Sequence, residues 1–108
     1  QLAELKAYPG GAIYGSTKWF LRNFMEVLRM ESASEGTNIK TSTLYPAAIN
    51  TELLSTISEN GTAEVMKAIY DKYGISPDRI ADVVAFALDA PQDTNITEFT
   101  IGPTIQPW

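Results

Sequence analysis

Hydrophobic side chains recur at intervals of three and four residues after a Pro-Gly-Gly loop at residues 9–11. The apolar positions are Ile13, Phe20, Leu21, Phe24, Met25 and Leu28. Because this spacing places side chains on one side of a helix, it predicts a helix over residues 12–34 that ends at Gly36. Arg22 and Glu26 lie four residues apart off the apolar stripe, so we expect an ion pair between them.

Two shorter segments have the composition of β-strands. Residues 39–45 are rich in Ile, Thr and Tyr and are bounded by Gly36 and Pro46, while residues 96–101 alternate in polarity. Both features favour strands.

Helical patterns occupy the region between the two predicted strands. Residues 63–73 form one candidate helix with Gly74 as its stop. A second helix is expected to begin with Ser76 as N-cap and Pro77 at the first helical position, and to stop before Pro91. Its apolar positions, which we expect to be buried, are Ile80, Val83, Val84, Ala87 and Leu88. Residues 51–57 have a weak helical pattern.

The resulting order of helix, strand, helices and strand defines the fold class. A strand, a helical crossover and another strand form a βαβ unit, whose strands are expected to be parallel. Two strands alone make a poor sheet. We therefore expect residues 1–108 to be one α/β unit, the C-terminal portion of a Rossmann-like doubly wound parallel sheet.

Composition excludes several kinds of site. The net charge is −5 and the eight Lys and Arg residues are scattered, which argues against nucleic acid and anionic membranes as partners. The chain contains neither Cys nor His, so we expect no zinc site, no thiol chemistry and no metal centre. No apolar run has the length of a membrane span, and no secretory leader opens the sequence; we expect a cytoplasmic protein.

The chemistry of the chain is concentrated at Tyr14 and Lys18. They are four positions apart in the sequence, so on a helix they lie on one face, one turn apart. An ammonium group near a phenol favours the ionised phenolate, which would make Tyr14 a usable proton donor and acceptor. Chance alone could supply such a pair, and the surrounding sequence must therefore be considered.

That surrounding sequence resembles the second half of a short-chain dehydrogenase/reductase. The resemblance rests on Tyr14-x-x-x-Lys18, a long helix, and a strand that ends in the segment Pro46-Ala47-Ala48-Ile49-Asn50-Thr51. It continues through the helix start at Ser76 and the final segment 99–103, and so covers essentially the whole chain.

The resemblance implies an NAD- or NADP-dependent oxidoreductase acting on a small carbonyl or alcohol substrate. Tyr14 would be the catalytic acid and base, and Lys18 would assist it and bind the ribose of the nicotinamide nucleotide. Pro46, Ala47, Ile49 and Thr51 fall on positions of the loop that lies against the nicotinamide. The resemblance also implies a homo-oligomer formed through helix 12–34, whose Trp19, Phe20, Phe24 and Met25 are expected to pack in a core or against a partner subunit.

Four features depart from the family pattern. Ala47 replaces the usual glycine of the loop, and the catalytic serine would fall near Gln1. The relay asparagine belongs to an upstream helix, and the 108 residues contain no Gly-x-x-x-Gly-x-Gly loop for the cofactor phosphates. We therefore expect the isolated chain to be inactive and to bind cofactor weakly or not at all. The alternative is a non-catalytic remnant that acts as a self-associating module.

Overall fold

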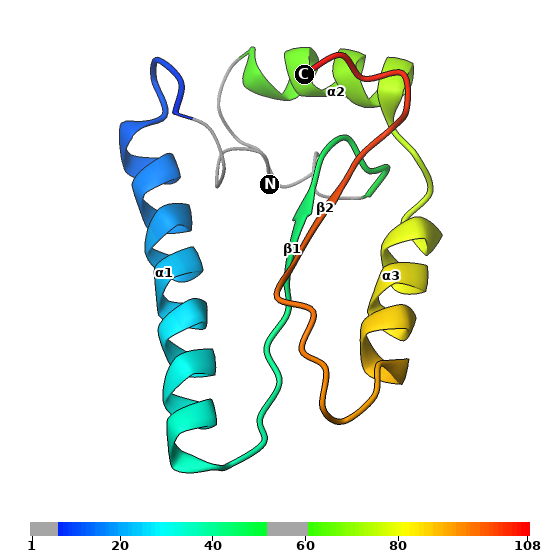
Figure 1. Ribbon diagram of the computed structural model, residues 1–108. Helices are drawn as coiled ribbons and strands as arrows, with labels where there is room; N and C mark the ends of the chain where they lie inside the picture. Colours follow the sequence, from blue (N-terminus) through cyan, green and yellow to red (C-terminus); the bar gives the residue numbers. More distant parts are fainter. Residues whose placement is uncertain (1–6, 52–60) are drawn as a thin grey trace.

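The computed structural model describes residues 7–51 and 61–108 and has an α/β architecture (Figure 1). Along the chain its elements are α1 (Ala12–Glu35), β1 (Thr43–Pro46), α2 (Thr62–Tyr73), α3 (Asp78–Asp89) and β2 (Glu98–Ile101). The predicted order of helix, strand, helices and strand is confirmed. The weakly helical segment predicted at 51–57 lies almost wholly outside the described residues.

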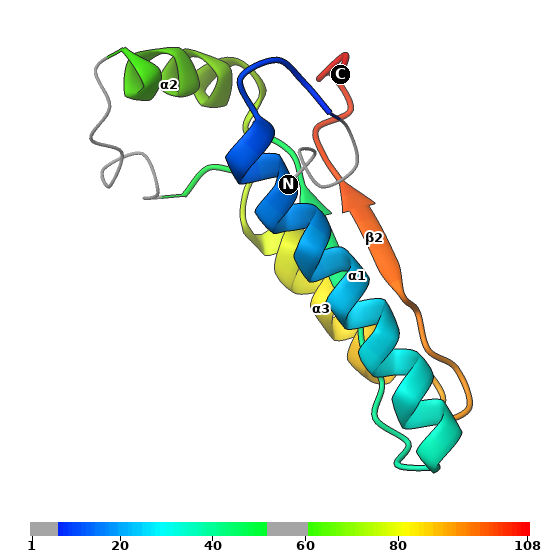
Figure 2. The same cartoon turned by 90° about the vertical axis from the view of Figure 1, so that its left-hand side faces the viewer.

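The two described strands pair in parallel, as predicted for a βαβ unit. Thr43 lies opposite Glu98, and Pro46 lies opposite Ile101. Helix α1 lies on one side of the strands and α3 lies on the other, which gives three layers (Figures 1 and 2). This arrangement is one portion of a doubly wound sheet.

Both strands are shorter than predicted at their N-terminal ends. The side chain of Asn95 accepts a hydrogen bond from the Thr41 amide (2.8 Å) and donates one to the Thr41 carbonyl (2.6 Å). The Ser42 hydroxyl donates to the Ile96 carbonyl (2.6 Å). Because side chains satisfy these backbone groups, the ladder begins only at Thr43. Pro46, predicted to follow the first strand, is its last residue.

Helix α1 ends as predicted, at a glycine. Gly36 has a left-handed backbone (φ 69°), and the amides of Gly36 and Thr37 donate to the carbonyls of Ala33 and Ser32. The buried Ser32 hydroxyl accepts a further hydrogen bond from the Ile39 amide (3.0 Å). These contacts turn the chain back towards β1.

Helix α3 begins two residues after the predicted N-cap. The Ser76 hydroxyl nevertheless accepts a hydrogen bond from the Asp78 amide (3.2 Å), which is the contact expected of a capping side chain. At the other end Lys40 donates to the carbonyls of Ala90 and Pro91, both at 3.1 Å. The predicted stop before Pro91 is confirmed.

Much of the apolar surface remains exposed. The predicted buried face of α3 is not buried, and Leu88 is 77% exposed. The buried hydrophobic residues of the described chain are Tyr45, Ala48 and Ile49. The accessible surface is 7,669 Å², whereas a compact monomer of 11.9 kDa exposes about 5,900 Å². The two described strands offer too little area to cover the three described helices, so the core is small.

Three aromatic side chains of α1 remain exposed in the described structure. Phe20 and Phe24 stack with ring centroids 6.2 Å apart but are 67% and 54% exposed. Trp19 is also exposed, and the Arg22 guanidinium lies 5.2 Å from its ring centroid. For these three side chains, packing in a core is not found in the described structure, and packing against a partner subunit stays a prediction.

Candidate functional site

Tyr14 and Lys18 lie in the first two turns of α1. The Lys18 ammonium nitrogen lies 5.5 Å from the centroid of the Tyr14 ring, so the spacing-based prediction that the two side chains meet is confirmed. Tyr14 is 40% exposed. The Thr17 hydroxyl donates to the Tyr14 carbonyl (2.7 Å) within the same turn. The Tyr14 side chain therefore lies near a positive charge and is partly exposed, so that a ligand can reach it.

The second group of predicted site residues follows β1. Pro46, Ala47, Ile49 and Thr51 belong to residues 46–51, which we call the β1 loop. The Ala47 amide donates to the Ile101 carbonyl (2.8 Å), which continues the β1–β2 pairing by one residue. Ala48 and Ile49 are buried. Residues 47–49 are therefore held against their neighbours although β1 ends at Pro46.

The junction between α2 and α3 fixes the other side of the β1 loop. The Ile75 amide donates to the Ala48 carbonyl (3.1 Å), and the Asn50 amide donates to the Ile75 carbonyl (2.9 Å). The Asn50 side-chain amide also donates to the Gly74 carbonyl (3.1 Å). A Cβ on Gly74 would lie 2.6 Å from the Tyr70 carbonyl oxygen, so a glycine is needed at this close approach.

These bonds determine where the backbone of Ile49 points. In a trans peptide the C=O and the following N–H point in opposite directions, and the described residues contain no cis peptide. Because the Ala48 carbonyl and the Asn50 amide both face Ile75, the N–H and C=O of Ile49 both point away from it. A peptide donor and acceptor are thus presented side by side on the opposite side of the loop.

The Tyr14–Lys18 pair and the β1 loop lie at the same end of the molecule. Helix α1 begins at the end where β1 finishes, since the helix and the strand run in opposite directions (Figure 1). Open α/β sheets bind ligands outside the carboxyl ends of their strands. The structure thus places both predicted groups at the end where such a fold binds ligands.

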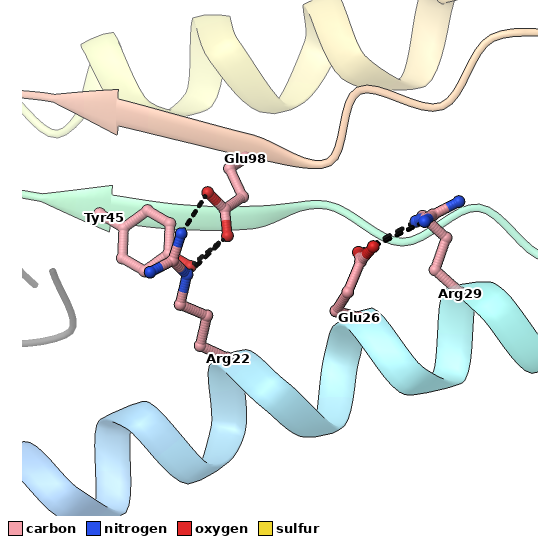
Figure 3. A network of polar contacts seen from close by, with 5 residues as sticks. All are labelled: Arg22, Glu26, Arg29, Tyr45 and Glu98. Carbon is pink, nitrogen blue, oxygen red and sulfur yellow. Dashed lines mark hydrogen bonds and ion pairs between the residues drawn. The ribbon is translucent and has the colours of Figure 1, made fainter.

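A polar network that the sequence did not predict ties α1 to the sheet (Figure 3). Arg22 donates through Nε and Nη2 to the two carboxylate oxygens of Glu98, at 2.9 and 3.2 Å. The Tyr45 hydroxyl donates to the same carboxylate (2.9 Å). Since Arg22 follows Lys18 by four residues and Tyr14 by eight, all three side chains share one side of α1. The network therefore orients the face that carries the catalytic candidates.

The predicted Arg22–Glu26 pair does not form. Glu26 accepts both hydrogen bonds of its pair from Arg29, at 2.6 and 3.0 Å, while Arg22 reaches β2. The hydrogen bonds from Arg22, and secondarily from Tyr45, hold the pKa of the Glu98 carboxyl below its usual value. The same Glu98 contact raises the pKa of Arg22. The sequence carries no signal for this pairing, because its partners are 76 positions apart.

An apolar groove of about 720 Å³ lies on the α3 side of the β1 loop. Its residues are Pro46, Ala47, Ile49, Thr51, Tyr70, Pro77, Ile80, Ala81, Val84, Ala85 and Leu88. Neither Tyr14 nor Lys18 lines it. The groove is therefore lined by all four predicted residues of the β1 loop but by neither member of the Tyr14–Lys18 pair.

Comparisons with known proteins agree with this arrangement. The family model described as short chain dehydrogenase matches residues 2–62. An uncharacterized oxidoreductase of Listeria monocytogenes is 65% identical over 107 residues, a match that covers 99% of this chain and 43% of the relative. A probable NADP-dependent dehydrogenase of Haemophilus influenzae is 30% identical over 106 residues, covering 97% and 41%.

Solved structures show the same fold. The closed form of serine dehydrogenase complexed with NADP+ superposes with a TM-score of 0.80 at 24% identity, over 98% of this chain and 42% of that one. An alcohol dehydrogenase from the archaeon Thermococcus sibiricus, complexed with 5-hydroxy-NADP, gives 0.70 at 23% identity, over 96% and 39%. At these identities the likeness concerns the fold alone.

The chain belongs to the short-chain dehydrogenase family, and it spans about two fifths of the length of the relatives it matches. In the part of the chain that the structure describes, no helix has the length and apolar character needed to cross a bilayer. Within the same residues, no group of acidic side chains is arranged to hold a metal ion.

Proposed function

We propose that this chain supplies the catalytic half of an NAD- or NADP-dependent oxidoreductase that interconverts a small carbonyl compound and its alcohol. The observation that carries the proposal is the Tyr14–Lys18 pair, with the ammonium 5.5 Å from the ring, at the end of the fold where β1 finishes. Family membership makes this pair the natural candidate for the catalytic acid and base.

Tyr14 moves the proton in this scheme. During reduction its hydroxyl donates a proton to the carbonyl oxygen, and during oxidation the phenolate takes that proton back. The nicotinamide supplies or accepts the hydride. Lys18 acts through its charge, because a nearby ammonium stabilises the phenolate, and through a hydrogen bond to the nicotinamide ribose.

The β1 loop would hold the nicotinamide. The N–H and C=O of Ile49 point to the same side, and such a pair complements a primary amide such as the carboxamide of nicotinamide. Thr51 adds a hydroxyl that can bond the carboxamide or a phosphate. Pro46 and Ala47 supply apolar surface at the end of β1. The donors and acceptors of this loop therefore fit the proposed cofactor.

The isolated chain should not bind the cofactor tightly. The phosphates and adenosine of a dinucleotide are held by a glycine-rich loop at a helix N-terminus, and the 108 residues contain no such motif. Titration with NADH and with NADPH, followed by fluorescence, should show no saturation at micromolar cofactor. The matched experiment uses a chimera in which these residues replace the corresponding segment of the Listeria monocytogenes relative.

The chimera should bind cofactor with saturation and should oxidise or reduce at least one member of a panel of small alcohols, aldehydes and ketones. The 65% identity between the two segments makes the exchange conservative. A folded chimera that binds neither NADH nor NADPH would overturn the proposed function. Saturable micromolar binding by the isolated chain would instead contradict the assignment of the phosphate site to another part of the protein.

The second candidate function is self-association through α1. Ile13, Phe20, Phe24 and Val27 follow one another at intervals of seven, four and three residues, and they are 83%, 67%, 54% and 41% exposed. Such a stripe matches the apolar seam of packed helices. A second copy of α1 would cover it, and such pairing is compatible with both a homo-oligomeric enzyme and a non-catalytic self-associating remnant.

Replacing Phe24 by Glu should shift the chain towards the monomer, because a charge in an apolar helix seam opposes pairing. Sedimentation velocity over a range of concentrations measures the association constant, which should fall at least tenfold. Ala33→Glu, at an exposed position of the same helix outside this stripe, is the control for charge and should leave association unchanged. Equal association of the Phe24→Glu variant and the parent chain would exclude this surface.

A further inference from the structure

Residues 102–108, which we call the tail segment, fold back over the β1 loop. Gly102 approaches Ala47 so closely that a Cβ on the glycine would lie 2.8 Å from the alanine Cβ. Pro103 is buried, and its carbonyl accepts a hydrogen bond from the Gln106 amide (3.1 Å), which closes a turn. The tail segment is therefore an ordered cover on this loop.

Gln106 links the tail segment to the backbone of the β1 loop. Its side-chain carbonyl accepts from the Ala48 amide at 3.1 Å, and Ala48 is only 2% exposed. Further along, the Trp108 ring meets the Tyr73 ring edge-on, with centroids 5.1 Å apart. Because Tyr73 is the last residue of α2, the tail segment connects the loop to the α2–α3 junction.

These contacts hold the two peptide planes on either side of Ala48. Gln106 holds the plane that contains the Ala48 N–H, and Ile75 holds the plane that contains the Ala48 C=O. The backbone dihedrals of Ala48 are thus restrained from both ends. The second plane also contains the Ile49 N–H, so Ile75 sets the direction of that donor and Gln106 restrains the plane that precedes it.

We propose that Gln106 is a positioning residue for the nicotinamide. It acts through Ala48, by holding the loop in the conformation that presents the N–H and C=O of Ile49. This inference rests on the proposed function. It gives the tail segment an indirect role in cofactor binding, in which the tail segment itself does not contact the cofactor.

Hydrogen exchange in the 108-residue chain tests the first half of the inference. Gln106→Met removes the acceptor at nearly constant volume, so the Ala48 amide should exchange about fivefold faster, the factor that one net hydrogen bond supplies. Gln106→Glu keeps an acceptor at the same position and should preserve the slow exchange. Gln92→Met, at an exposed position after α3, is the matched control and should have no effect. Unchanged exchange at Ala48 in Gln106→Met would overturn the proposal.

Cofactor affinity in the chimera with the Listeria monocytogenes relative tests the second half. Gln106→Met should raise the Kd of NADPH or NADH, whichever the parent chimera binds, about fivefold. It should change kcat less than twofold at saturating cofactor, since Tyr14 and Lys18 are untouched. Gln106→Glu should restore the affinity. A general loss of folded protein would lower the rate at saturating cofactor as well, so weaker binding with kcat retained distinguishes positioning from folding.

Different experimental results would contradict the proposed function and the positioning role of Gln106. If the parent chimera folds but binds no cofactor, the proposed function fails, and the positioning role fails with it. If the parent chimera binds cofactor and Gln106→Met binds it equally well, only the positioning role is overturned. Faster exchange at Ala48 without any loss of affinity also overturns the positioning role, because the hydrogen bond would then be structural.

Discussion

Tyr14→Phe in the chimera should lower kcat by about 10²- to 10⁴-fold, the usual contribution of a positioned acid or base. The substitution removes only the hydroxyl. The ring that faces the Lys18 ammonium remains, so the fold of α1 and the cofactor Kd should change little. Initial rates at saturating cofactor, together with a fluorescence titration, separate the loss of chemistry from a loss of binding.

The control for this substitution is Tyr73→Phe. It removes a hydroxyl from the end of α2 and keeps the ring that meets Trp108, so the rate should stay within twofold of the parent. Undiminished kcat in Tyr14→Phe would refute the assignment of Tyr14 as the proton donor, whatever the cofactor affinity.

Lys18→Met gives an independent measure of the same pair. Removing the ammonium disfavours the phenolate, so the pH at which alcohol oxidation reaches half its maximum rate should move upwards. An unchanged profile in Lys18→Met would show that the charge of Lys18 does not act on the proton-transfer step.

The second large effect concerns stability and its dependence on pH. Arg22→Met should lower the free energy of unfolding at pH 7 by roughly 1 kcal/mol, because a partly exposed ion pair contributes only modestly to stability. The side chains of Arg22 and Glu98 are 33% and 39% exposed, so solvent screens their attraction. Urea denaturation of the 108-residue chain and its variant measures the difference. Arg29→Met, which breaks a pair internal to α1, should have a smaller effect.

The pH dependence follows from the direction of the Glu98 shift. The folded state lowers the pKa of Glu98 below its unfolded value of 4.5, chiefly through the hydrogen bond from Arg22. This stabilisation is therefore complete above the unfolded pKa and disappears as the pH falls through the folded pKa. The difference between the parent chain and Arg22→Met should shrink steadily below pH 4.5. A difference that persists undiminished after Glu98 is protonated would contradict the ion-pair explanation.

The outline of the fold could be predicted because it depends on neighbours in the chain. The period of α1, its stop at Gly36 and the parallel order of the strands all follow from local patterns and chain connectivity. The prediction failed for the strand starts and for the partner of Arg22. In both cases a side chain that is distant in the sequence, Asn95 or Glu98, accepts a hydrogen bond for which local sequence patterns predict another acceptor.

The extent to which the helices are buried could also not be predicted from local sequence patterns. The apolar positions of α3 have the period of a buried face, yet Val84 and Leu88 are 41% and 77% exposed. A helical period of apolar residues identifies a hydrophobic face of the helix. Whether that face is buried depends on whether other elements pack against it. The two short strands of the described residues are too small to do so.

By itself, the sequence determined the meeting of Tyr14 and Lys18, because four residues make about one helical turn and no other element is needed. It also determined that Ala47, Ile49 and Thr51 follow a strand, although Pro46 proved to be the last residue of that strand. Only the tertiary structure decided that Gln106 holds Ala48, that Ile49 turns its peptide groups away from Ile75, and that Arg22 reaches Glu98. Those partners lie far apart in the chain and meet only because the packed elements bring them together.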